Sequence, residues 1–279
     1  MGFARHLNLV VAISVLFFAK LSWASSLSDA EILNRAAEQR TLVLSVAKNY
    51  VLAAANIDVK SSQKEQSKSL SQFTHNLQVL KFNTPNTYIR ESLKTLNKDW
   101  NDFTALTTQK ASPENVEAVI EATNKLVFVA DLITANWRGL SSDRELEALN
   151  LAHMQAMLSE RIGLLYAAHY YGLKDDWVVM ELNETLQAYE SSLAFLKRFT
   201  GKDSEVAKNL EQVGHQWTYA KQGFAKFNQG HYLPKVIAVT MGTMQQEMNT
   251  VARHYSQSYS SQEPSFSSLS VPGLAANME

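Results

Sequence analysis

Residues 33–42, LNRAAEQRTL, return in altered form 116 positions later as residues 149–158, LNLAHMQAML. In both segments the apolar residues are spaced three and four apart, which is the period of an amphipathic helix. The pairs that coincide at this offset are Leu33 with Leu149, Asn34 with Asn150, Ala36 with Ala152, Gln39 with Gln155, Leu42 with Leu158 and Tyr50 with Tyr166.

The correspondence continues along the rest of the chain. One inserted residue changes the offset from 116 to 117, and Trp100 then coincides with Trp217. Matches in this order with a single change of register indicate an internal duplication. The further pairs are Leu70 with Leu186, Phe73 with Tyr189, Leu77 with Leu193, Leu80 with Leu196, Phe82 with Phe199, Leu93 with Leu210, Val119 with Val236 and Ile120 with Ile237.

The repeat predicts the fold class. The periodicity is helical nearly throughout, and each copy divides into four helical segments separated by short breaks, as in an antiparallel bundle with short loops. We predict an all-α protein of two tandem antiparallel four-helix bundles, residues 25–138 and 139–255. The predicted helices are residues 29–56, 63–82, 87–107 and 113–137 in the first bundle, and 143–173, 177–199, 204–227 and 233–255 in the second.

The two ends of the chain differ from the repeats. Residues 1–24 combine Arg5, a short apolar run and a small-residue motif that ends at Ala24, which predicts a cleaved secretory signal peptide, with a retained membrane anchor as the alternative. Residues 256–279 are rich in serine, include Pro264 and Pro272, and are predicted to be a disordered tail. We therefore expect a periplasmic protein with no membrane span after cleavage.

Composition narrows the chemistry. The sequence contains no cysteine, which excludes disulfides, thiol nucleophiles and cysteine-held iron–sulfur clusters. Loss of Arg5 and Lys20 with the signal peptide reduces the basic residues from 26 to 24 against 27 acidic ones, a formal charge of −3 that argues against nucleic-acid binding.

Sequence signatures of catalysis are missing. None of the six histidines after the signal segment follows a carboxylate by three residues, so the di-iron pattern of helical bundles is absent. No glycine-rich phosphate loop or hydrolase motif is present either. We expect a non-enzymatic protein without a cofactor, and a haem or metal bundle is the weaker alternative.

One basic residue interrupts the apolar stripe of the first predicted helix. Arg40 lies on the row formed by Leu33, Ala37, Leu44 and further apolar residues, which should face other helices. A guanidinium in that place needs an anion, and its planar fork suits a carboxylate or an oxyanion. Two alternatives are that Arg40 extends toward water or pairs with an internal glutamate. Asn34 and Asn150 have a similar alternative as polar residues satisfied near a helix start.

The segment 149–162, LNLAHMQAMLSERI, resembles a known family pattern, Ile-Asn-x-Ala-Gly-x-Gln-Arg-Met-Leu-Ser-x-Arg. This is the motif of the N-terminal domain of type IV pilus methyl-accepting chemotaxis transducers, which is also found in the periplasmic region of nitrate/nitrite sensor kinases. Residues 33–42 are a more divergent copy, and Trp100 and Trp217 resemble the tryptophan of the family's third helix. The resemblance implies a periplasmic sensory bundle that binds a small anion from its first helix, at a dimer interface.

The two copies keep different parts of that motif. Only Arg40 matches the motif's first arginine, because the second copy has Ala156 there, whereas Arg161 matches the second arginine. The motif glycine is replaced by Ala37 in one copy and by His153 in the other. The resemblance implies ligand contacts from Arg40, Asn34, Ala37, Asn150 and Arg161, with a small anion as the ligand.

Two functions from different classes fit these features. In the first, two fused copies reproduce within one chain the pair that sensors form by dimerisation, and the protein acts as a ligand-binding or sensory-accessory partner of a membrane receptor or envelope protein. In the second, it is a helical protein–protein interaction module of the cell envelope with no small ligand. A homodimer is possible, but a stable homodimer joined through the first helices would count against the first function.

Overall fold

The computed structural model describes residues 27–140, 143–200, 204–224, 227 and 230–262. Over these ranges the predicted all-α class is confirmed, since the chain forms eight helices and no strand. The helices are α2 Asp29–Ala54, α3 Val59–Phe82, α4 Thr87–Thr107, α5 Pro113–Arg138, α6 Arg144–Tyr171, α7 Asp176–Phe199, α8 Glu205–Phe224 and α9 Pro234–Gln262.

Capping side chains determine where three of the helices begin. Ser28, Asn86 and Ser112 precede α2, α4 and α5, and each side-chain oxygen accepts a hydrogen bond from the backbone N–H three residues later, at 2.9 to 3.2 Å. Each bond satisfies one of the N–H groups that the first turn of a helix leaves unpaired. Pro113 occupies the first turn of α5, where its missing N–H costs nothing.

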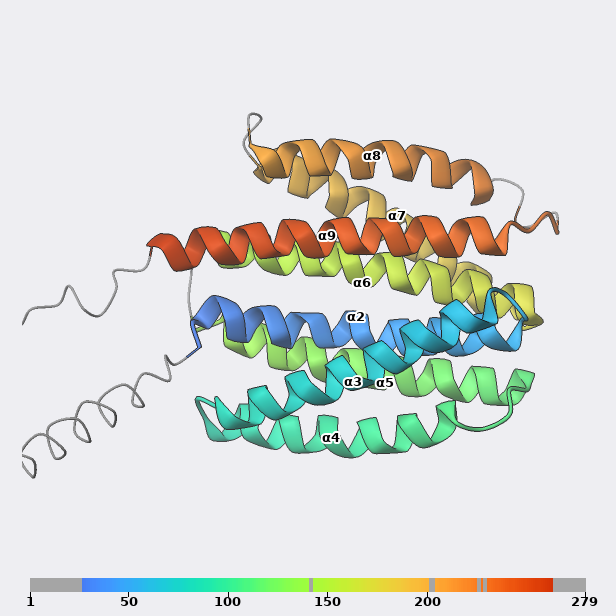
Figure 1. The fold of residues 1–279 in the computed structure, drawn as a ribbon, viewed down its shortest axis with the longest axis horizontal. Helices are drawn as coiled ribbons and strands as arrows, with labels where there is room; N and C mark the ends of the chain where they lie inside the picture. Colours follow the sequence, from blue (N-terminus) through green and yellow to red (C-terminus); the bar gives the residue numbers. More distant parts are fainter. Residues whose placement is uncertain (1–26, 141–142, 201–203, 225–226, 228–229, 263–279) are drawn as a thin grey trace, which may run out of the picture.

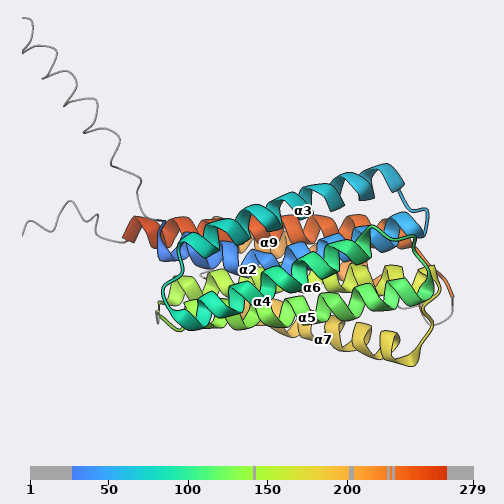
Figure 2. The same cartoon turned by 90° about the horizontal axis from the view of Figure 1, so that it is seen from below.

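Helices α2 to α5 form one antiparallel bundle and α6 to α9 form a second (Figure 1). The bundles meet mainly through their first helices, because α2 packs along α6, and α9 also touches α2. Side-chain bonds between α2 and α6 join residues 110 to 119 positions apart, so the two helices run in the same direction. Figure 2 shows all the helices following one long axis, with α3 and α7 on opposite sides of the molecule. The α2–α6 contact is called the seam below.

Equivalent residues make equivalent contacts in the two bundles. Gln39 Nε2 donates to the backbone oxygen of Phe73 at 3.2 Å, and Gln155 Nε2 donates to the backbone oxygen of Tyr189 at 3.1 Å. The ring of Phe73 lies 3.7 Å from that of Trp100, and the ring of Tyr189 lies 4.5 Å from that of Trp217. An internal repeat predicts such pairs, because each ties the second helix of a bundle to the first and third.

The prediction that residues 256–279 are disordered was wrong for residues 256–262. Helix α9 continues through residues 256–262, because Tyr255 and Tyr259, one turn apart, both pack against the core. The rest of that prediction, residues 263–279, lies outside the described residues, as does the predicted signal peptide at residues 1–24. None of the helices in the described part of the chain is long and apolar enough to cross a membrane.

Candidate functional site

Arg40 of α2 points into the seam, and only 3% of its side chain is exposed. Its Nε donates to the backbone oxygen of Ala37 at 3.2 Å, its Nη1 to Asp131 Oδ1 at 2.6 Å and its Nη2 to Asn150 Oδ1 at 3.0 Å. Burial lowers the pKa of Arg40 and the neighbouring Asp131 raises it, but an arginine remains charged in either case. Each nitrogen of the guanidinium therefore has an acceptor.

The carboxylate that pairs with Arg40 is Asp131, not the internal glutamate that one alternative predicted. It comes from α5, and 62% of its side chain is exposed, whereas the arginine it pairs with is buried. The ion pair thus has one side in the core and one side in solvent. The Asp131 carboxylate is already largely hydrated, so it loses little when it moves away into water. Asp131 is therefore the acceptor of Arg40 that a solute can replace most easily.

His153 of α6 makes the reciprocal contact across the seam. Its Nε2 lies 2.8 Å from Asn34 Oδ1, an acceptor, so the ring carries its proton on Nε2 and leaves Nδ1 as an acceptor. Burial, with a contribution from the positive charge of Arg40, lowers the pKa of His153 to about 3. The ring is therefore neutral at physiological pH. Its Nδ1 is buried and has no hydrogen-bond partner among the described residues.

The two motif asparagines thus have matching roles. Asn150 on α6 accepts from Arg40 on α2, and Asn34 on α2 accepts from His153 on α6. These bonds cross the seam in opposite directions, as expected for two parallel helices related by an approximate two-fold axis. The donors themselves break this symmetry, because Arg40 corresponds to Ala156 and His153 to Ala37.

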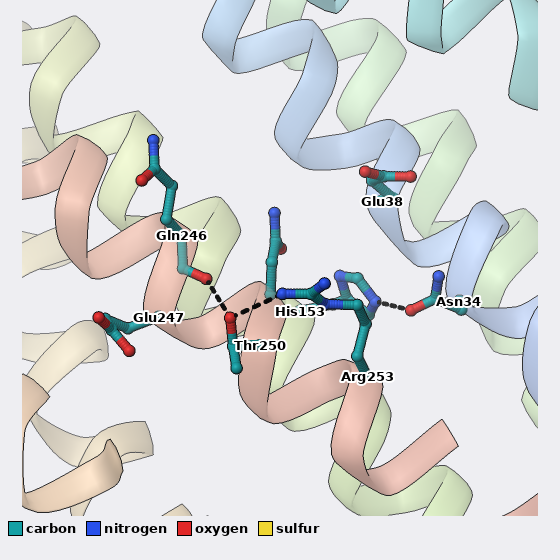
Figure 3. Close-up of a pocket in the computed structure, with 8 residues that line it drawn as sticks. Asn34, Glu38, His153, Gln246, Glu247, Thr250 and Arg253 are labelled. Atoms are coloured by element: carbon teal, nitrogen blue, oxygen red, sulfur yellow. Dashed lines mark hydrogen bonds between the residues drawn. The ribbon is translucent and has the colours of Figure 1, made fainter. Parts of the chain in front are cut away.

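A cavity of about 490 Å³ opens beside this network, between α2, α6 and α9. Figure 3 shows Asn34 and His153 joined by their hydrogen bond, with Thr250 and Arg253 of α9 nearby. The Oδ1 atom of Asn249 is buried at the same place without a hydrogen-bond partner in the described part of the chain. The lining residues are Asn34, Glu38, His153, Gln246, Glu247, Asn249, Thr250 and Arg253.

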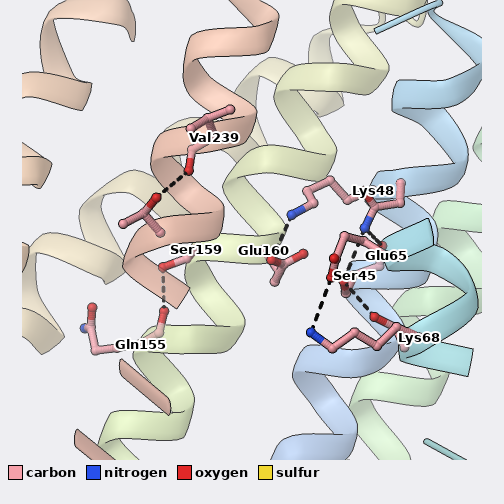
Figure 4. Close-up of polar contacts among 11 residues, drawn as sticks. Ser45, Lys48, Glu65, Lys68, Gln155, Ser159, Glu160 and Val239 are labelled. Carbon is pink, nitrogen blue, oxygen red and sulfur yellow. Dashed lines mark hydrogen bonds and ion pairs between the residues drawn. The ribbon is translucent and has the colours of Figure 1, made fainter. Parts of the chain in front are cut away.

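A buried ion pair crosses the seam farther along the helices. Lys48 Nζ of α2 lies 2.8 Å from Glu160 Oε1 of α6, and the two side chains are 7% and 2% exposed (Figure 4). Gly163 makes room for it, since a Cβ there would stand 2.9 Å from Lys48 Cδ. The symmetry-related positions hold Leu44 and Leu164, both buried, so the ion pair has an apolar counterpart.

The structure brings together four of the five predicted site residues, Asn34, Ala37, Arg40 and Asn150. It does not bring Arg161 to them. This residue lies about three turns farther along α6 than Asn150, and it forms an ion pair with Glu181 of α7 instead of a bond across the seam.

Several residues at the site were not predicted. His153 was identified only as the residue that replaces the motif glycine, whereas it lines the cavity. Asp131 and the α9 residues carried no recognisable signal, because they lie far from the motif in sequence. Lys48 could have been found, since it is a charged residue within the apolar stripe of α2.

Among the residues that the structure describes, no group of three or more histidine, aspartate or glutamate side chains could hold a metal ion. Comparison with known proteins finds no family model, curated protein or solved structure that matches the chain. What the fold and the site define is a class: an all-helical protein of two bundles that meet at a parallel pair of helices with a polar, partly open seam.

Proposed function

We propose that the protein is a non-enzymatic ligand-binding or sensory-accessory module of the periplasm, with its ligand site at the seam between the two bundles. The observation that carries this proposal is the polar network of Asn34, Arg40, Asn150 and His153 beside an open cavity where the two bundles meet. Buried polar groups cost stability unless they are hydrogen-bonded, and apolar side chains would hold two helices together equally well. A polar network in this place is therefore consistent with a role beyond packing.

The arrangement of the first helices supports the sensory part of the proposal. In the family that the motif resembles, ligand contacts come from the first helix at a dimer interface. Here α2 and α6 lie side by side and parallel within one chain, which is the geometry that two fused copies require. A membrane receptor or another envelope protein is the proposed partner, to which the occupied module would bind.

A small anion can bind Arg40 by taking the place of Asp131. The guanidinium already donates from all three nitrogens, but the Asp131 carboxylate is the one acceptor that is largely in solvent. A planar oxyanion such as nitrate or formate presents the same acceptor geometry as that carboxylate. The seam therefore has a built-in competitor for an anionic ligand.

Removal of that competitor tests the proposal on the chain that begins at residue 25. Asp131→Ala leaves the buried Arg40 guanidinium without its counter-charge, so we expect a lower melting temperature than in the wild type. Nitrate, nitrite, formate or acetate should restore it by binding the native state, and saturation at 100 times Kd adds about 2.7 kcal/mol. Thermal-shift titrations measure both effects.

Arg161→Ala in the Asp131→Ala background is the matched control, because Arg161 is also on a first helix but outside the seam. Anion rescue should survive this change and should be abolished by Arg40→Ala. If no anion raises the melting temperature, and a broad panel of neutral and cationic small molecules also has no effect on the wild type, the proposal fails. The interaction-module alternative would then start from Phe128 and Leu132, exposed apolar residues one turn apart on α5.

A further inference from the structure

We infer that the cavity between α2, α6 and α9 binds the primary ammonium group of a small amino-acid-like ligand. This inference rests on the proposed function and specifies its ligand, at a position beside Arg40 and not on it. Two residues that line the cavity have buried acceptor atoms with no hydrogen-bond donor in the described part of the chain, and Arg253 on α9 is a cation. These groups are complementary to the ammonium and the carboxylate of a zwitterion.

Two unpartnered acceptors carry the argument. His153 Nδ1 and Asn249 Oδ1 are both buried, both belong to residues that line the cavity, and neither has a hydrogen-bond partner in the described part of the chain. A buried acceptor left unpaired is costly, so native proteins satisfy nearly all of them with protein, water or ligand. A ligand that supplies N–H donors satisfies both acceptors at once.

The charges around the cavity favour a positive group there. Glu38 of α2 and Glu247 of α9 line it, against one cation, Arg253. Burial raises the pKa of Glu38, while its hydrogen bond from Asn76 and the nearby Arg35 oppose that shift. The neighbouring Arg40 is already paired with Asp131, which reduces its repulsion of a cation. An ammonium group, with three donors, fits two acceptors and a carboxylate.

Arg253 supplies the complementary charge. It is an exposed residue of α9, its Nη2 donates to Thr250 Oγ1 at 2.9 Å, and both residues line the cavity (Figure 3). A guanidinium binds a carboxylate through two parallel N–H donors. The ligand expected from both ends of the site has an ammonium group facing His153 and Asn249 and a carboxylate facing Arg253. A cavity of about 490 Å³ has room for such a molecule.

Calorimetric titration of the chain from residue 25 with each of the twenty common amino acids tests the inference. At least one should bind. For the tightest, two analogues follow: the hydroxy acid, in which a hydroxyl replaces the ammonium group, and the amine that lacks the carboxylate. We expect loss of the ammonium group to weaken binding about tenfold or more, the factor for an unmade buried hydrogen bond, and loss of the carboxylate to weaken it less.

Variants on α9 locate the binding site. Asn249→Leu removes one acceptor, so the Kd of the amino acid should rise about tenfold. Arg253→Gln should weaken the amino acid but leave the Kd of its decarboxylated amine unchanged, because that amine has no group for Arg253 to bind. Arg161→Gln, outside the cavity, is the control and should change neither value.

The outcomes separate this inference from the proposed function. If no amino acid or amine binds while anions rescue Asp131→Ala, the inference is overturned and the proposed function stands. If neither class binds, both are overturned. If an amino acid binds with the same Kd to Asn249→Leu and Arg253→Gln, its site lies elsewhere and the inference is again overturned.

Discussion

The two bundles agree in how each is held together and differ where they meet. Gln39 and Gln155 bond to the second helix of their own bundle in the same way, at 3.2 and 3.1 Å. At the seam, by contrast, Arg40 and His153 have only alanine at the corresponding positions. Contacts within a bundle are needed twice, whereas one polar group at the seam serves both halves. The two bundles are therefore alike inside and asymmetric at the seam, which is where we propose the ligand site.

Substitutions at the Lys48–Glu160 pair should have the largest effect on the unfolding free energy, and they test whether the two sides of the seam are equivalent. Glu160→Leu alone leaves a buried ammonium group unpaired, and we expect a loss of about 3–5 kcal/mol of unfolding free energy. The double variant Lys48→Leu/Glu160→Leu makes this side of the seam as apolar as the side of Leu44 and Leu164, and should be at least as stable as the wild type. Urea unfolding gives the three free energies. If the single and the double variant lose equal unfolding free energy, an apolar pair cannot replace Lys48 and Glu160 as it does on the side of Leu44 and Leu164.

His153 makes the second test, through pH. Its pKa is 6.5 when unfolded and about 3 when folded, so the unfolded state binds the proton more tightly. The stability due to the neutral ring is complete above pH 6.5 and is lost as the pH falls toward 3. At pH 5 the loss is about 2 kcal/mol.

His153→Ala, which gives the second bundle the residue that the first has at Ala37, removes this titration. Unfolding free energies measured from pH 7.5 to 5 should then fall less steeply in the variant than in the wild type, by about 1.4 kcal/mol per pH unit below 6.5. Parallel profiles would mean that His153 is protonated as easily in the folded protein as in the unfolded chain.

The smallest expected change in stability tests whether Gln39 and Gln155 have equivalent roles in the two bundles. Gln39→Ala and Gln155→Ala each remove one buried side-chain hydrogen bond to the backbone, and Gln155→Ala also removes a bond to Ser192. With Gln155→Ala made and compared in a Ser192→Ala background, we expect similar losses of about 1 kcal/mol from the two glutamine changes. Gln212→Ala on the exposed surface of α8 is the control and should cost less than half of that. Urea midpoints suffice for the comparison. Unequal losses would show that the two glutamines do not have the same role.

The helices were predictable because their signal is local. Apolar residues three and four positions apart define a buried stripe whatever the rest of the chain does, and the predicted segments agree with the helices to within a few residues at most ends. The exception is the end of α9, where Tyr259 lies in a serine-rich stretch that looks polar. Its contact with the core of the second bundle keeps that turn helical.

The candidate site was predictable only on the helices that carry the motif. Asn34, Ala37, Arg40 and Asn150 follow from the repeat and from the stripe on which Arg40 lies. Arg161 was included on the motif alone, and its pairing with Glu181 shows that a motif position need not face the seam.

The sequence by itself determined the helices and placed a cation on the apolar stripe of the first helix, and its repeat predicted two bundles, because such patterns depend on residues close in the chain or at a constant offset. Only the tertiary structure decided which groups meet: Asp131 reaches Arg40 across 91 positions and Asn150 across 110, and α9 closes the cavity over His153. These contacts depend on how whole helices pack, and that packing is set by the sum of many weak apolar contacts that no single segment contains.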